Sequence, residues 1–260
     1  MSLDDTFAAA FHAHRQAGDL FHDSSSHAHE VFQTSTINAL LEGVYDGSTS
    51  FAELSTHGDF GLGTFNGLDG EMTAVDGAFF QIKSDGLAYP VDPAMRTPFA
   101  VMMFFDPTLT VEIDEHMDFP TFAAALDAAV PSKNIFYAIK SVGRFREVRV
   151  RSVPKQEKPY PPLVEVVDGQ PVFEHKDVEG TLMGFRFPDY AQGINVPGYH
   201  LHFLTANKSA GGHVMDFHTH HATVEIDITS DFHMELPNAG DFMNAELAKD
   251  TSGDIAKVEK

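Results

Sequence analysis

The chain has 260 residues, of which 43% are hydrophobic, so it can bury the core of one large domain or two smaller ones. Its 38 acidic and 17 basic residues leave a net charge of −21, which argues against a nucleic-acid partner because phosphates require a basic surface. The absence of cysteine excludes disulfides, thiolate metal sites and a cysteine nucleophile. No run approaches the ~18 apolar residues of a membrane span and the acidic N-terminus does not resemble a secretory signal, so we expect a cytoplasmic protein without a membrane partner.

The first half of the chain predicts a short helical region followed by strands. We expect residues 1–30 to form a loosely ordered arm and residues 31–43 to form a helix that ends near Gly43. Asp76-Gly77 suits a tight hairpin turn between two of the strands. The predicted strands are 60–66, 71–75, 78–83 and the apolar run 99–106, and an alanine-rich helix is predicted at 122–130 between two prolines.

The second half predicts strands almost throughout. Two strands, 135–141 and 145–153, are expected to turn at Gly143, and the proline-rich segment 154–162 is interpreted as a linker. The further strands are predicted at 164–167, 171–174, 181–187, 199–205, 212–217 and 222–229. A last helix is predicted at 239–249, before a short polar tail at 252–260.

A histidine pair on one of these strands indicates a metal site. His200 and His202 flank a single residue and therefore lie on the same face of a strand. The turn-rich segment 207–212 can fold a second strand back, which would bring His213 beside the pair. Three converging imidazoles form an open zinc site with room for water or substrate. The alternative is chance spacing, because the chain has 15 histidines and most histidines are surface or hydrogen-bonded groups.

Basic residues are concentrated in one segment of this acidic chain. Seven of the 17 bases lie between Lys140 and Lys158, and such a cluster could attract a small anion. The alternative is a solvated edge strand that charges protect from aggregation. Within the cluster, Arg151 ends a strand just before a proline-braced loop, a position that suits a fixed carboxylate clamp.

Several motif blocks are distributed over most of the chain. The glycine-rich segment 61–72, which by itself favours either an unusual backbone or a simple strand and turn, contains one of them. The blocks span about residues 31 to 217: Val31–Thr36, Leu40–Gly47, Gly63–Glu71, Val153–Tyr160, Gly198–Phe203 and Gly211–Asp216. In sequence and in order, they resemble the alpha-acetolactate decarboxylase family.

The resemblance implies a complete active site. Its zinc ligands would be His200, His202 and His213, with Arg151 facing the substrate, and its two active-site glutamates would be Glu71, by motif, and Glu259, by position near the C-terminus. The implied reaction is the zinc-dependent decarboxylation of 2-acetolactate to (R)-acetoin and CO2 through an enediolate, with no organic cofactor. Which glutamate delivers the proton stays open.

The resemblance also implies an α/β fold of two β-sheet-centred domains with flanking helices, mixed or antiparallel sheets, and a homodimer formed through the larger sheet. With the linker near residue 160, we expect an N-terminal domain at 1–160 with the larger sheet. A zinc-binding β domain would follow at 161–260, its tail returning to the active site.

Two other functions remain open on the residues alone. One is a zinc or small-ligand binding protein without catalysis. The other is a cupin-type metal oxygenase, although cupins usually place a glutamate three or four residues after the histidine pair, where this chain has Thr205 to Asn207. The remaining nearby histidines, His218, His220, His221 and His233, are interpreted as surface groups or partners of the ligands.

Overall fold

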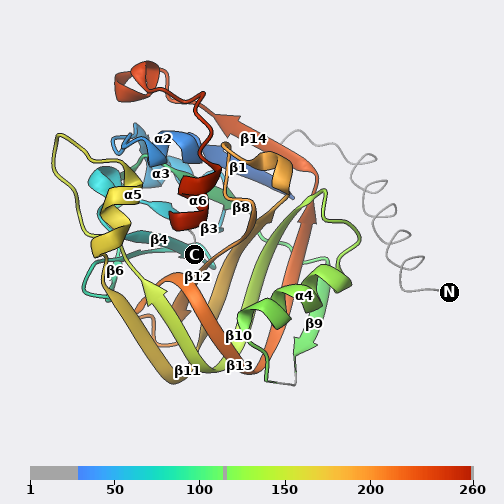
Figure 1. Cartoon of the computed structure of the whole chain (residues 1–260). Helices are drawn as coiled ribbons and strands as arrows, with labels where there is room; N and C mark the ends of the chain where they lie inside the picture. Colours follow the sequence, from blue (N-terminus) through green and yellow to red (C-terminus); the bar gives the residue numbers. More distant parts are fainter. Residues whose placement is uncertain (1–28, 114–115, 259–260) are drawn as a thin grey trace.

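Two β-sheets form the body of the molecule in the computed structural model, which describes residues 29–113 and 116–258 (Figure 1). The predictions for residues 1–28 and for Glu259 lie outside the described residues. Within the described ranges, no helix is both long and apolar enough to cross a membrane. The predicted α/β class, with mixed and antiparallel sheets and flanking helices, is confirmed.

The larger sheet has seven strands, and all neighbours in it are antiparallel except β1 and β14, which are parallel. Asp76 and Gly77 join β4 to β5 with positive φ angles of 51° and 76°, so the predicted hairpin is confirmed. In order across the sheet, the strands are β14 (Asp231–Glu235), β1 (Glu30–Thr34), β8 (Ala100–Met103), β3 (Phe60–Thr64), β4 (Glu71–Val75), β5 (Ala78–Ile82) and β6 (Ala88–Pro90). Two short strands, β2 (Thr49–Ser50) and β7 (Arg96–Thr97), pair separately.

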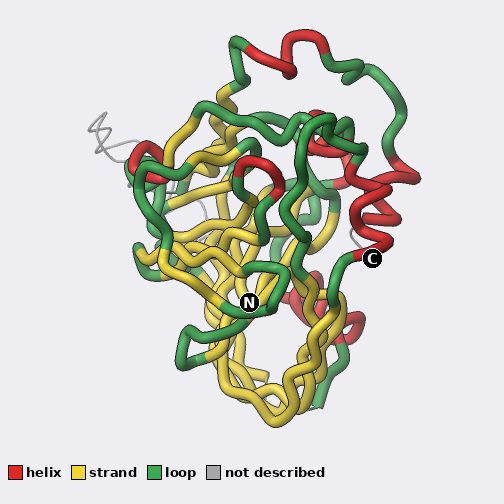
Figure 2. The backbone as a smooth tube through the Cα atoms, turned by 90° about the vertical axis from the view of Figure 1, so that its left-hand side faces the viewer, coloured by secondary structure: helices red, strands yellow, loops and turns green. Residues whose placement is uncertain are grey.

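The second sheet closes on itself. Its order is β10 (Phe136–Arg151), β11 (Val172–Phe187), β12 (Gly198–Thr205), β13 (Gly211–Thr229) and β9 (Leu109–Ile113). Because β10 also pairs with β13, the four strands β10 to β13 form a closed barrel. Figure 2 shows the strands running through the middle and the lower part of the molecule, with helices and loops mainly above them and on the right.

Gly143 lies inside a strand and does not form the predicted turn. Residues 136–151 form one continuous strand in which Gly143 lies opposite Gly180 on one side and Ala222 on the other. A Cβ atom at this position would lie 2.3 Å from the carbonyl oxygen of His221, so glycine allows a close approach of strands here. The strands predicted at 212–217 and 222–229 are likewise one strand, β13.

The helices are short and lie around the sheets. The helix at 122–130 is confirmed as α4, capped by Asp118. The helix predicted at 31–43 is wrong in its first half, where buried residues form strand β1 of the larger sheet. The segment 239–249 contains only a 3₁₀ turn, and the predicted strand at 164–167 is helical. The helices are α2 (Ile37–Leu41), α3 (Phe51–Leu54), α4 (Phe119–Ala129), α5 (Leu163–Val166) and α6 (Ser252–Val258), with 3₁₀ turns η1 (Asn66–Leu68), η2 (Val167–Gly169), η3 (Asp189–Ala191) and η4 (Gly240–Asn244).

One hydrophobic core lies between the two sheets. It contains Leu62 and Val101 from the larger sheet, Met183 and Phe185 from the barrel, and Ile255 of α6. The strands do not divide between the sheets at residue 160, since β9 and β10 precede that position and belong to the barrel, while β14 follows it and belongs to the larger sheet. The chain therefore crosses between the sheets more than once.

A buried ion pair also joins the two sheets. His29, next to β1, has its Nδ1 atom 2.7 Å from Oδ1 of Asp227, a fully buried residue of β13. The backbone N–H of Asp106 donates to the other carboxylate oxygen of Asp227. The hydrogen bond to Asp227 raises the pKa of His29 above its ordinary value of 6.5. The pairing therefore favours the protonated form of His29.

We expect His29→Asn to lower the free energy of unfolding more at pH 6 than at pH 9. The pKa of His29 is raised on folding. The contribution of the His29–Asp227 pair to the free energy of unfolding is therefore complete below pH 6.5, and it is lost as the pH rises through the pKa of the folded protein. The loss at pH 6 should be about 1.5–3 kcal/mol, as for a hydrogen bond to a charged group. Urea unfolding of both proteins at the two pH values measures this. Equal losses at pH 6 and pH 9 would contradict the charged pair, and His233→Asn serves as a control on the exposed strand β14.

Candidate functional site

A single row of paired residues across the barrel brings the predicted site together. His213, near the start of β13, lies opposite His202 of β12 on one side and opposite Arg151 of β10 on the other. Residues directly opposite one another on paired strands share a face of the sheet, and His200 lies on the same face two residues from His202. The predicted return strand, with His213 beside the His-x-His pair, is thus confirmed.

The three histidines form a group that can hold a metal ion. One ring nitrogen from each lies within 4.8 Å of the others, and all three side chains are buried. This spacing allows three nitrogens to meet one ion at the ~2.0–2.1 Å bond length of zinc. Among the described residues, this is the one group of histidine, aspartate and glutamate side chains with such geometry.

The ring of His202 is oriented by the backbone of the larger sheet. Its Nδ1 atom lies 2.9 Å from the carbonyl oxygen of Met72, and because a carbonyl only accepts, Nδ1 carries the proton and donates. Nε2 is therefore the unprotonated nitrogen, and it makes no hydrogen bond to any described residue. A histidine ligand held through its other nitrogen by a carbonyl is typical of protein metal sites.

Burial keeps the cluster uncharged. It lowers the pKa of His200 to about 3, and the nearby positive charge of Arg151 lowers it further. For the same main reason, the pKa values of His202 and His213 lie well below the ordinary value. All three rings are neutral at pH 7, which is the form that binds a metal.

Glu71 reaches the cluster from the larger sheet. It is the first residue of β4, and its Oε2 atom lies 3.7 Å from Nε2 of His202. The preceding Gly70 has φ +90°, and a Cβ atom there would lie 2.3 Å from the carbonyl oxygen of Ile82. Glycine is therefore required where the chain turns into β4, which explains part of the glycine-rich segment.

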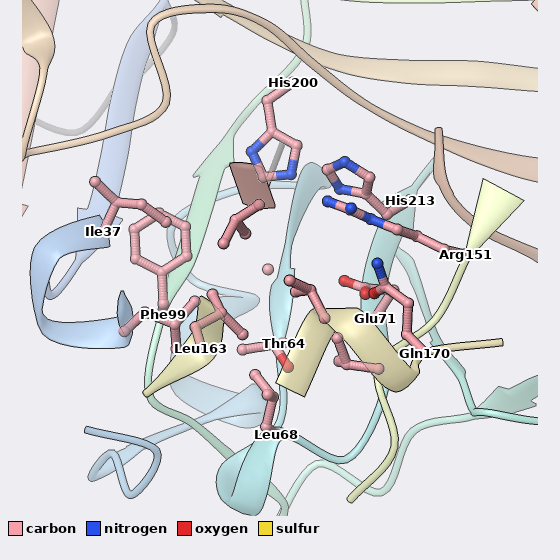
Figure 3. Close-up of a pocket in the computed structure, with 15 residues that line it drawn as sticks. Ile37, Thr64, Leu68, Glu71, Phe99, Arg151, Leu163, Gln170, His200 and His213 are labelled. Carbon is pink, nitrogen blue, oxygen red and sulfur yellow. The ribbon is translucent and has the colours of Figure 1, made fainter. Parts of the chain in front are cut away.

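Arg151 is separated in space from most of the basic cluster. It is 5% exposed, and Figure 3 shows its guanidinium beside His213 at the pocket. By contrast, Arg146 and Arg149 are exposed, and Lys140 pairs with Asp76 on the surface. The solvated-strand interpretation therefore fits most of the cluster, although β10 is paired on both sides and is not an edge.

The site opens into a pocket with one polar and one apolar side (Figure 3). The polar side contains Arg151, Glu71, Gln170 and two of the histidines, while Thr64 lies near Leu68 in Figure 3. Neither Thr64 nor Gln170 was predicted as a site residue from the sequence. The apolar side is formed by Ile37, Leu40, Leu68, Phe99, Val153, Leu163, Val167 and Val258.

The C-terminal helix closes part of this pocket. Ile255 and Val258 of α6 are both buried, which confirms that these residues anchor the tail to the body. Lys257 adds an ion pair of 2.9 Å with Asp168. Glu259, the residue after Val258, lies outside the described residues. The other histidines that the structure describes are not part of the metal group. The Nε2 atom of His220, for example, lies 3.5 Å from Oδ1 of Asp177.

Comparison with known proteins identifies the family. The family model described as alpha-acetolactate decarboxylase matches residues 31–249. The chain belongs to the alpha-acetolactate decarboxylase family. It is 58% identical over 259 residues to the alpha-acetolactate decarboxylase of Methylococcus capsulatus, with 100% of each chain covered, and 52% identical to that of Methanosarcina mazei, covering 93% of this chain and 84% of the relative.

The fold of the family is the fold observed here. The crystal structure of alpha-acetolactate decarboxylase from Bacillus subtilis strain 168 matches with a TM-score of 0.87 and 44% identity. The match covers 88% of this chain and 99% of that structure. The resemblance inferred from the motifs is therefore confirmed.

We expect the cluster to bind one divalent metal ion per chain, which Co²⁺ can report through the visible absorption of a tetrahedral site. His202→Ala should abolish this signal because two ligands rarely hold such an ion. His220→Ala, a matched change outside the cluster, should leave it intact. Full metal occupancy in His202→Ala would refute the assignment of the ligands.

Proposed function

We propose that this protein decarboxylates 2-acetolactate to (R)-acetoin and CO2, with a zinc ion held by His200, His202 and His213. The observation that carries the proposal is that the buried Arg151 lies in register with His213 and His202, while His200 and His213 line the same pocket as Arg151. A carboxylate and a metal-seeking oxygen on the same small molecule can be bound together there. The names of the relatives agree with this substrate.

The donor set suits zinc, which accepts three histidine nitrogens and keeps an open position in catalytic sites. When bound, the ion supplies Lewis-acid stabilisation of the negative charge that develops on the substrate oxygens.

The protein side chains position the substrate for the loss of CO2. Arg151 binds the carboxylate through its planar fork and holds it in place for departure. When the bond to CO2 breaks, its electron pair flows into the neighbouring ketone and leaves an enediolate. The apolar side of the pocket, formed in part by Leu163 and Val258, keeps water away from this intermediate.

Protonation of the enediolate completes the reaction. A glutamic acid delivers a proton to the carbon that has lost CO2, and delivery to one face determines the hand of the product. Glu71 is positioned beside His202 and lines the pocket, while Glu259 is the second candidate by its place in the sequence. Both glutamates stay in the proposal.

Measurement of CO2 release from racemic acetolactate under nitrogen tests the function. We expect CO2 and (R)-acetoin in equal amounts. A non-catalytic binding protein would release no CO2 above the uncatalysed rate, and a cupin-type oxygenase would be inactive until oxygen is admitted. Either result would reject the proposal.

We also propose that the protein is a homodimer that pairs through the larger sheet. The edge strand β14 is bonded on one side only, to β1, among the described residues, which supports this choice. Sedimentation of the purified protein measures the mass.

We expect Arg151→Lys to lower turnover by at least about a hundredfold while zinc content is unchanged. Lysine keeps the positive charge but loses the planar fork that holds the carboxylate. Steady-state kinetics and metal analysis on the same preparation measure both quantities. Near-normal turnover would show that Arg151 does not clamp the substrate.

We expect Glu259→Gln to lower turnover by about a hundredfold, the usual effect of removing a general acid or base. Because Val258 is buried, the matching truncation should remove only residues 259 and 260, so that the packing of α6 is kept. Glu246→Gln serves as the control. Unchanged turnover in both tail variants would leave Glu71 as the one glutamate for the proton transfer.

A further inference from the structure

Gln170 has a buried acceptor at the pocket that no described residue uses. The residue follows η2 and precedes β11, and its backbone N–H donates to the carbonyl of Val167. Its side chain lines the pocket, and Figure 3 shows the amide group next to Glu71 and Arg151. The Oε1 atom is buried and has no hydrogen-bond partner among the described residues.

A buried carbonyl without a partner is unfavourable, so its retention at a binding site indicates a donor on the ligand. The other polar groups at the pocket already have roles, and Glu71 is a candidate proton donor in the proposed reaction. The hydroxyl of Thr64 donates to the carbonyl of Gly70, and Arg151 supplies donors only. The acceptor of Gln170 is therefore available to the ligand.

The proposed substrate has one donor. Acetolactate carries a carboxylate and a ketone, which only accept, and a hydroxyl on carbon 2, which donates. Arg151 can satisfy the carboxylate, but it cannot accept a hydrogen bond from the hydroxyl. The Oε1 atom of Gln170, as an acceptor, and the 2-hydroxyl group of the substrate, as a donor, are therefore complementary.

We propose that Gln170 binds substrate directly, with its Oε1 atom accepting a hydrogen bond from the 2-hydroxyl group. This inference rests on the proposed function. It adds that the site selects its substrate by the 2-hydroxyl group. The residue makes the pocket specific for 2-hydroxy acids over acids that carry an alkyl group at carbon 2. A site built to pair with a hydroxyl rejects the analogue that lacks it, because its own polar group is then left buried and unpaired.

Two inert ligands that differ in one group test the assignment: 2-hydroxy-2-methylbutanoate and 2,2-dimethylbutanoate. Their affinities for the zinc-loaded protein are measured by calorimetry, which does not depend on turnover. We expect the preference for the hydroxy acid to shrink by about ten- to a hundredfold in Gln170→Met, which has a similar shape but no carbonyl. Any contribution of the metal to the preference is present in both proteins and cancels.

Two further variants serve as controls. Gln170→Glu keeps an acceptor, so its preference for the hydroxy acid should survive even if its added charge weakens both ligands equally. Gln192→Met, at an exposed position outside the pocket, should behave as the unaltered protein does. An unchanged preference in Gln170→Met, or an equal loss for both ligands, overturns the inference. CO2 release by the unaltered protein is measured on the same preparation, so a failure of the proposed function is seen separately.

Discussion

The pairing of β13 with two strands at once is the constraint on which the site depends. Near its start, β13 contacts β12 and β10, so that His213 lies between His202 and Arg151 in one row. Side chains in such a row point to the same face, which sets the metal group beside the carboxylate-binding group. A shift of β13 by one residue against its neighbours would turn His213 to the opposite face, away from His202 and Arg151.

The larger sheet covers this row and prepares its side chains for binding. Packing of β4 over the row supplies the carbonyl of Met72, which fixes the proton of His202, and the carboxylate of Glu71. The same burial keeps the imidazoles neutral and therefore able to bind a metal. The packing of the two sheets thus stabilises the fold and also lowers the pKa values of the three histidines.

Some local features of the fold are predictable from the sequence, although the helix at 31–43 and the strand at 164–167 are not correct, and long-range pairings are not predictable. The Asp76-Gly77 hairpin, α4 and the His-x-His return strand depend on neighbouring residues and are confirmed. The turn predicted at Gly143 is wrong because the two strand neighbours of this glycine, Gly180 and Ala222, are distant in sequence. Gln170 carries no motif, and only the folded chain shows that its acceptor is buried at the pocket.

The central claim is that the metal group and Arg151 act on the same small molecule, and the visible spectrum of the Co²⁺-loaded protein tests it directly. Titration with 2-hydroxy-2-methylbutanoate should shift the Co²⁺ absorption to saturation, and Arg151→Lys should raise the ligand concentration that gives half of the shift. A spectrum that does not change while calorimetry detects binding would contradict the account, because the two groups would then serve separate sites.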